Sequence, residues 1–129
     1  EGKEVSEDDF FKKASSGGTL ISSGLAKELE IVEKRYPVNS WNIYSFHCSD
    51  GENWKEDNPK ALDCMEKVIR ISQMSSYIQI NHEGDNLWGV EMTELFSSLE
   101  SEKFKLVKIK EKEDIWPQFS KLFGGKANV

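Results

Sequence analysis

The feature that most constrains this chain is the alternation of short, apolar, strand-like segments with longer segments whose apolar residues recur at helical spacing. Residues 20–36 form the first helical segment, with apolar side chains at steps of three and four residues that fall on one face of a helix. Pro37 marks its end. The next segment, Trp41 to Cys48, is aromatic and partly apolar on both faces, which is typical of a central strand covered by helices on both sides.

The alternation continues to the end of the chain. A second helix is predicted from Asn58 as its cap, with Pro59 as its first residue, followed by a strand from Tyr77 to Asn81. A third helix then precedes the lysine-rich strand Phe104 to Lys110, which is predicted at an edge of the sheet because lysines there discourage pairing with another chain. The last helix is predicted from Asp114 to Gly124-Gly125. Each of these three helices is predicted to bury an apolar stripe. The stripe of the second helix consists of Ala61, Leu62, Met65, Val68 and Ile69, and that of the third helix of Trp88, Met92, Leu95, Phe96 and Leu99. The stripe of the last helix consists of Trp116, Phe119, Leu122 and Phe123.

This order of elements predicts the fold class. Strands and helices in alternation favour an α/β domain with a doubly wound, mostly parallel sheet and helices on both faces. The length of 129 residues fits a single domain over residues 1–129. Within it, residues 1–15 are interpreted as the tail of a strand, Gly2 to Val5, and an acidic lead-in, and residues 16–129 as the alternating core.

Composition excludes several classes of partner and compartment. The 23 acidic against 17 basic residues give a net charge of -6, which argues against binding to a nucleic-acid backbone. No apolar run approaches the roughly 18–20 residues that span a bilayer, and the acidic start is unlike a signal peptide, so we expect a cytoplasmic protein without a membrane partner. Cys48 and Cys64 are expected to be buried thiols and not a disulfide framework. His47 and Cys48 are adjacent in a strand and point to opposite faces, which argues against a shared zinc ion or thiol catalysis.

Two short motifs indicate a candidate site. Gly17-Gly18-Thr19 precedes the first helix, and Ser49-Asp50-Gly51 follows the first long strand. Loops at the carboxyl ends of parallel strands line the ligand crevice of open α/β sheets, so the Thr19 hydroxyl and the Asp50 carboxylate are predicted to meet there. Such oxygen donors suit a hard divalent cation. The alternative is purely structural: a glycine turn with Thr19 or Ser22 as a helix cap, and an ordinary Asp-Gly turn.

Taken together, the two motifs and the helix between them resemble the von Willebrand factor A domain, a Rossmann-like fold. In that family they provide two of the three segments of a metal-ion-dependent adhesion site. The intervening residues resemble the YhbH/YeaH family of bacterial proteins of poorly defined function, which are associated with sporulation in one lineage and with stress responses beside a serine/threonine kinase in another. The resemblance rests on Glu1-Gly-Lys-Glu-Val5, Phe10-Phe11, Ser16-Gly-Gly-Thr19, Ser22-Ser23, Glu33-Lys-Arg-Tyr-Pro37, Trp41-Asn-Ile-Tyr44, Phe46-His47, Ser49-Asp-Gly51, Asn53-Trp54, Glu56-Asp-Asn58, Lys112-Glu-Asp-Ile-Trp-Pro117 and Phe123.

One departure from the family pattern sets the expected limits of the site. The Asp-x-Ser-x-Ser segment that ends the family's first, central strand does not occur in this sequence. The resemblance therefore implies a C-terminal part of the domain, with a sheet that lacks this strand and leaves one edge of Trp41 to Cys48 unpaired. An unpaired edge favours self-association. The metal site would be partial, so no tightly held ion is expected here, whereas the intact protein would hold Mg²⁺ or Mn²⁺.

The function that the resemblance implies is a non-enzymatic, metal-dependent protein-binding module. Asp50 would anchor the ion and Thr19 would coordinate it, leaving one position for a carboxylate of a protein partner. The surrounding rim is predicted to consist of Ser22, Ser23, Asn53 and Trp54. The alternatives are a structural or regulatory domain without a working metal site and, less favoured, a metal-dependent hydrolase or phosphoryl-transfer enzyme that uses Asp50. Neither His47 nor His82 lies in a motif that requires catalysis.

Overall fold

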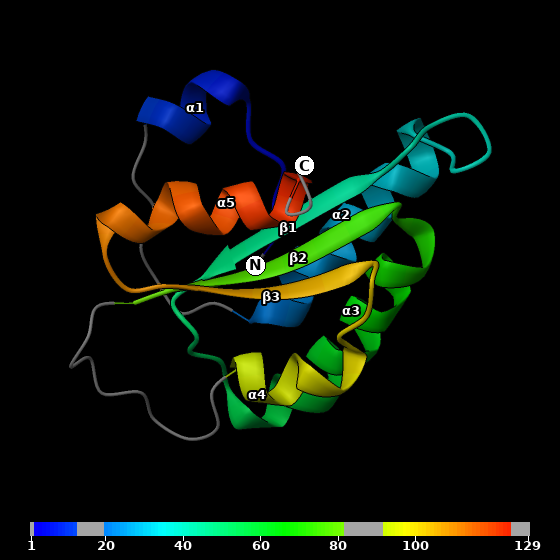
Figure 1. The fold of residues 1–129 in the computed structure, drawn as a ribbon. Coiled ribbons are helices and arrows are strands. Elements are labelled where there is room, and N and C mark those ends of the chain that lie inside the picture. Colours follow the sequence, from blue (N-terminus) through cyan, green and yellow to red (C-terminus); the bar gives the residue numbers. More distant parts are fainter. Residues whose placement is uncertain (1, 13–19, 82–91, 125–129) are drawn as a thin grey trace.

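The protein is built on a three-stranded parallel sheet, seen in a computed structural model that describes residues 2–12, 20–81 and 92–124. Strands β1 (Tyr44–Ser49), β2 (Met74–Ile80) and β3 (Phe104–Ile109) lie side by side in that order (Figure 1). Their register pairs Ser49 with Gln79 and Gln79 with Lys108. The parallel α/β architecture and the edge position of β3 confirm the prediction from the sequence.

Helices cover the two faces of the sheet unequally. Helices α2 (Ile21–Arg35), α3 (Asn58–Ile71) and α4 (Met92–Phe96) lie on one side, and α5 (Ile115–Gly124) lies on the other (Figure 1). Helix α1 (Glu7–Lys12) buries none of its residues. Three short 3-10 turns complete the elements: η1 (Lys55–Asp57), η2 (Ser97–Leu99) and η3 (Lys112–Asp114). None of the helices in the described ranges is long and apolar enough to cross a membrane.

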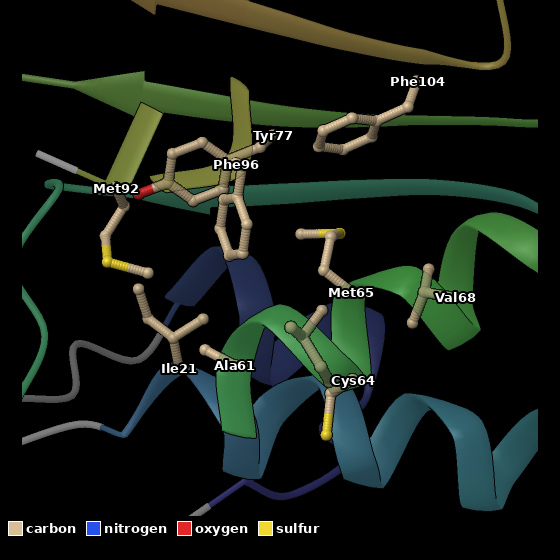
Figure 2. Packing of buried hydrophobic residues seen from close by; sticks show 10 residues of the cluster. Ile21, Ala61, Cys64, Met65, Val68, Tyr77, Met92, Phe96 and Phe104 are labelled. Carbon is tan, nitrogen blue, oxygen red and sulfur yellow. The ribbon is translucent and has the colours of Figure 1, made fainter. Parts of the chain in front are cut away.

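Most of the core lies between the sheet and α2, α3 and α4. Tyr77 points from the central strand into this layer, where its ring meets Phe96 edge-on at 5.0 Å between centroids (Figure 2). The next residue of β2, Ile78, points to the opposite face, as strand geometry requires, and packs beneath α5. The larger cluster comprises Ile21, Leu25, Ala61, Cys64, Met65, Val68, Tyr77, Met92, Phe96 and Phe104, whereas the smaller one has Ile78, Val107 and Ile109 with Phe119 and Leu122 against them.

Several predicted boundaries are wrong by a few residues. The segment from Gly2 to Val5 is not a strand; the backbone of Gly2 approaches the first turns of α2 so closely that a Cβ on it would lie 2.3 Å from the Ser23 carbonyl oxygen. Strand β1 begins at Tyr44 and not at Trp41. Strand β2 begins three residues before the predicted start, at Met74.

The ends of two helices differ from prediction as well. Asn58 belongs to α3, and Asp57 precedes it, although Pro59 stands in the first turn as expected. Glu111, and not Asp114, begins the turn that leads into α5, and Asp114 reaches back to accept hydrogen bonds from the amides of Lys110 and Glu111. His82 and Trp88, the latter predicted in the stripe of the third helix, lie outside the described residues.

The predictions that the whole apolar stripe of α5 is buried and that Cys48 is buried are wrong. Phe119 and Leu122 of α5 pack against residues of β2 and β3, whereas Trp116 and Phe123 lie outside this cluster and remain 78% and 63% exposed. Cys48 lies on the same face of β1, beyond the helix, and is exposed, while Cys64 is buried as expected.

Strand β1 pairs only with β2 among the described residues. The segment that its sequence pattern predicted as a central strand therefore lies at an edge of the described sheet. On the α5 side of this strand Tyr44 is 58% exposed and Phe46 37%. Phe46 contacts Phe123 of α5, with 5.5 Å between ring centroids, so the apolar surface of β1 continues onto α5.

Replacement of Phe96 tests the position of the core. Phe96 is fully buried and packs edge-on against Tyr77 and Phe104, so Phe96→Ala is expected to lower the free energy of unfolding by about 3–5 kcal/mol. The exposed Phe10 of α1 provides the control, and Phe10→Ala is expected to change it by less than about 0.5 kcal/mol. Urea unfolding followed by circular dichroism measures both values. Equal losses in the two variants would contradict the assignment of the core.

Candidate functional site

The carboxyl ends of β1 and β2 carry a loop that is tied to the start of α2. This loop runs from Asp50, directly after β1, to the 3-10 turn η1 before α3. Loops at this edge of a parallel sheet are where α/β domains bind ligands. Two side chains of the loop, Asn53 and Asp57, make hydrogen bonds with residues more than 30 positions earlier in the chain.

These bonds satisfy the first amides of α2. The Ile21 amide donates to Asn53 Oδ1 at 2.9 Å, and the Ser22 amide donates to Asp57 Oδ2 at 3.0 Å. The Ser22 hydroxyl donates to Asp57 Oδ1. The first amides of a helix have no partner within the helix, and Leu20, at the cap position, has no side chain that can supply one. We call these four residues, Ile21, Ser22, Asn53 and Asp57, the α2 clamp.

The clamp is closed by a further set of bonds within the loop. The Asn53 side-chain amide donates to Asp57 Oδ2 and to Asn58 Oδ1, both at 3.0 Å. Burial of Asp57, which is only 7% exposed, favours its neutral form, but the hydrogen bonds from Ser22 and Asn53 outweigh this effect and hold the pKa of Asp57 below its ordinary value. The negative charge also lies at the positive end of the α2 dipole, which stabilises it.

Asp50 is placed differently from the clamp. It is exposed, and its Oδ1 accepts a hydrogen bond from the Glu52 amide at 3.0 Å, while no hydrogen bond reaches Oδ2 among the described residues. Ser49 Oγ accepts one from the Gly51 amide at 3.1 Å, and Gly51 has a φ of +92°, a conformation that favours glycine. The motif is therefore a tight Asp-Gly turn that also leaves one carboxylate oxygen available to solvent.

The structure places the other predicted site residues in different surroundings. Ser22 and Asn53 come together in the α2 clamp, and the Ser22 side chain is buried. Ser23 is partly exposed, and its hydroxyl donates to the Leu20 carbonyl at 2.9 Å. Trp54 projects from the loop, 62% exposed. Thr19 lies outside the described residues.

Asp57 is the residue that sequence reasoning missed. In the sequence it stands only as part of the Glu56-Asp-Asn58 motif, without a predicted role at the site. The signal that could have found it is the absence of a capping side chain at Leu20, which requires that the first amides of α2 find acceptors elsewhere.

The side chains at the end of β1 carry the oxygen atoms that a hard cation prefers, but they are too few to hold such an ion tightly. Asp50 and Ser49 offer oxygen atoms, which Mg²⁺ and Mn²⁺ prefer. The described part of the chain contains no group of three or more His, Cys, Asp or Glu side chains placed to hold a metal ion. One exposed carboxylate is fewer than the several protein ligands that a stable site needs, so tight binding requires donors beyond these residues.

A second polar cluster lies beneath the middle of α2. Burial raises the pKa of Glu28, partly offset by a hydrogen bond from the Ser45 side chain. Burial lowers the pKa of His47, whose ring stacks on Tyr77 with 5.7 Å between centroids. His47 thus packs into the core face of the sheet, on the side away from Cys48.

Comparison with known proteins places the chain in a bacterial family. The family described as "Protein of unknown function (DUF444)" matches residues 1–126. A UPF0229 protein of Ruminiclostridium cellulolyticum is 42% identical over 120 residues, which cover 93% of this chain and 30% of that protein. UPF0229 proteins of Oceanobacillus iheyensis and Vibrio parahaemolyticus are 39% and 40% identical, over 95% and 94% of this chain and 31% and 28% of their own lengths. No solved structure matches this chain.

Neutralisation of Asp57 tests the clamp. Asp57→Asn keeps the shape but removes the charge and one acceptor, so it is expected to lower the free energy of unfolding at pH 7 by about 1–3 kcal/mol. Because the folded-state pKa of Asp57 is depressed, its contribution is complete above the unfolded value of about 3.9 and is lost as the pH falls through the folded value. The difference between wild type and variant should therefore shrink below about pH 4.

Urea unfolding at a series of pH values measures this difference. The matched control is Glu56→Gln, which removes the charge of the exposed neighbouring carboxylate and is expected to leave stability at pH 7 nearly unchanged. A difference between wild type and Asp57→Asn that stays constant from pH 7 to pH 2.5 would show that the Asp57 charge does not contribute.

Proposed function

The chain belongs to the DUF444 family of bacterial proteins of unknown function, and we propose that it forms part of a non-enzymatic, metal-dependent protein-binding domain of the von Willebrand factor A type. The observation that carries the proposal is Asp50, an exposed carboxylate at the carboxyl end of β1, at the edge of a parallel sheet. The α2 clamp fixes the rest of its loop. This is the position at which α/β domains bind ligands.

The proposed ion is Mg²⁺ or Mn²⁺ in the intact protein. Asp50 would hold it, directly or through water, and Thr19 would add a hydroxyl ligand from the segment before α2. The remaining ligands would come from the Asp-x-Ser-x-Ser segment that the family resemblance implies. The chain spans less than a third of the length of the relatives it matches, and chains of that length have room for such a segment.

The proposed partner is a protein that completes the coordination of the ion with a carboxylate. Trp54 is the strongest candidate for contact outside the ion, because it is exposed on the same loop as Asp50 and large aromatic side chains dominate interface energies. Ser23 would lie beside it, whereas Ser22 and Asn53 would act by holding the loop. The net charge of -6 argues against nucleic acid. From the family resemblance alone we propose a cytoplasmic role in stress response or sporulation, linked to a serine/threonine kinase system.

A structural or regulatory domain without a metal site is the second candidate. It is favoured by the α2 clamp, whose carboxylate and amide groups bond to one another and leave the loop ordered without an ion. A hydrolase or phosphoryl-transfer enzyme that uses Asp50 has less support, because catalysis needs a base near the carboxylate and His47 stacks on Tyr77 in the core face.

The open edge of β1 supports a further proposal, self-association of the 129-residue chain. The unpaired edge adjoins the exposed Phe46, which contacts Phe123 beside a shallow groove of about 530 Å³ on α5. The groove is lined by Ile115, Trp116, Phe119, Ser120 and Phe123. Unpaired strands and contiguous exposed apolar surface are features of interfaces, and a second copy offers the same edge and surface by symmetry.

Titration of the longer protein with metal tests the leading proposal. Saturable binding of Mg²⁺ or Mn²⁺, measured by calorimetry, is expected in the wild type and should be lost in Asp50→Ala. The matched control is Glu52→Ala, which removes another exposed carboxylate of the same loop and should bind as the wild type does. Saturable binding that is unchanged in Asp50→Ala would contradict the role of Asp50, and no binding to the wild type would favour the domain without a metal site.

Light scattering after size-exclusion chromatography tests self-association of the 129-residue chain. A monomer–dimer equilibrium that shifts toward dimer with concentration is expected, and Phe46→Lys should shift it toward monomer because a charge on an edge strand opposes pairing. Phe10→Lys, at an exposed aromatic residue of α1 outside this surface, is the control. A monomer at all concentrations up to several hundred micromolar would contradict the proposal.

A further inference from the structure

The two edge strands of the described sheet differ in the residues that they carry. Strand β3 contains Lys105 and Lys108, and lysines on an edge strand oppose pairing with another chain. The sequence of β1, Tyr44–Ser49, contains no lysine, arginine, carboxylate or proline. Among the described residues β1 pairs only with β2, so its outer edge has none of these protections. This uncharged edge is therefore suited to pairing with a further strand.

The backbone groups on the outer edge of β1 belong to alternate residues. The Ile43 carbonyl accepts a hydrogen bond from the Gln73 amide at 2.8 Å, so the backbone groups of Ile43 face β2. Because the direction of these groups alternates along a strand, those of Tyr44, Phe46 and Cys48 face outward. The side chains of the same three residues lie on the α5 side, where Tyr44 and Cys48 are exposed and Phe46 is partly exposed.

A second copy of the chain matches this edge when the two β1 strands run antiparallel about a two-fold axis. Opposed residues whose backbone groups face each other then exchange two hydrogen bonds. An axis at Phe46 places Phe46 opposite Phe46 of the second copy, and Tyr44 opposite Cys48 of the second copy, so every outward-facing residue of β1 is paired. An axis at Ser45 or His47 would place one of them opposite a residue outside the strand.

The same arrangement agrees with the charges and side chains of this edge. Asp50, just beyond the strand, falls opposite Asn42 of the second copy, so no like charges are opposed along the strands. Because the axis is perpendicular to the sheet, the α5 sides of both copies form one face, and the two Phe46 rings are neighbours on it. Each Phe46 also contacts Phe123 of its own α5. The pairing therefore covers part of the exposed apolar surface of β1.

We propose that the self-associated form is a sheet-extension dimer, in which the two β1 strands pair antiparallel about a two-fold axis at Phe46. This arrangement rests on the proposed self-association, to which it adds the geometry, and it is independent of the proposed metal ion. The two sheets join into one continuous sheet. The two Asp50 turns then lie at opposite ends of it, about 27 Å apart along the strands, so dimerisation keeps the two candidate sites separate.

Disulfide cross-linking of the 129-residue chain tests the position of the axis. In a background of Cys48→Ser and Cys64→Ala, Phe46→Cys is expected to form a covalent dimer under mild oxidation, because opposed residues have Cα atoms about 5.5 Å apart, within disulfide range. Tyr44→Cys with Cys64→Ala is expected to cross-link as well, between position 44 of one copy and Cys48 of the second copy. Gel electrophoresis without reductant measures the rate of dimer formation.

The matched controls carry a single thiol that the axis keeps away from its symmetry mate. Cys64→Ala alone retains Cys48, and Tyr44→Cys with Cys48→Ser and Cys64→Ala retains only the thiol at position 44. In both controls the two thiols lie about 14 Å apart along the strands, beyond disulfide range. Their cross-linking should be at least about tenfold slower, because only the paired thiols have a high effective concentration. All four variants share Cys64→Ala, so any effect of that buried position on folding is common to them.

The outcomes separate this arrangement from self-association itself. A dimer in light scattering whose paired variants cross-link no faster than the controls would overturn the axis at Phe46 and leave self-association standing. Faster cross-linking through Cys48 alone would place the axis elsewhere and overturn it too. Absence of a dimer in light scattering would overturn both, whereas metal binding by the longer protein is decided separately by Asp50→Ala.

Discussion

The carboxylate of Asp57 is the interaction on which the edge of this fold depends. It accepts bonds from the Ser22 amide, the Ser22 hydroxyl and Asn53, and so joins the start of α2 to the loop that leaves β1. Because Leu20 cannot cap the helix, the first turn of α2 takes its acceptors from a loop more than 30 residues away. This arrangement gives the first amides of α2 their acceptors and ties the loop after β1 to that helix.

The unequal covering of the sheet by helices leaves an apolar surface of β1 partly exposed. The face that α2, α3 and α4 cover holds the larger core cluster, whereas the smaller cluster lies between α5 and strands β2 and β3. The aromatic residues Tyr44 and Phe46 of β1 are therefore left partly exposed beside an open strand edge. Relatives more than three times as long carry additional chain that can occupy such a surface, and in the isolated chain we propose that a second copy covers it.

The sequence predicts the elements that have strong periodicity and fails where structure depends on distant contacts. Helices α2 and α3 and strand β3 lie within a residue or so of their predicted bounds, because their apolar patterns are local. Strand β2 begins earlier than predicted because Ser75 and Ser76 are buried polar residues, which apolar patterns do not reveal. The exposure of Trp116 depends on how many strands lie beneath α5, which no local pattern encodes. The hydrogen bond from the Ser22 amide to Asp57 joins residues 35 positions apart, so only the fold brings them together.

Amide hydrogen exchange of Ile21 and Ser22, measured by nuclear magnetic resonance, tests most directly whether the clamp orders this edge. Their amides are the first of a helix and would exchange quickly in a frayed end. Because they donate to Asn53 and Asp57, we expect protection close to that of Ile78 in the central strand. Exchange as fast as in an unstructured peptide would show that the loop is not held to α2 and that the α2 clamp does not order this edge of the sheet.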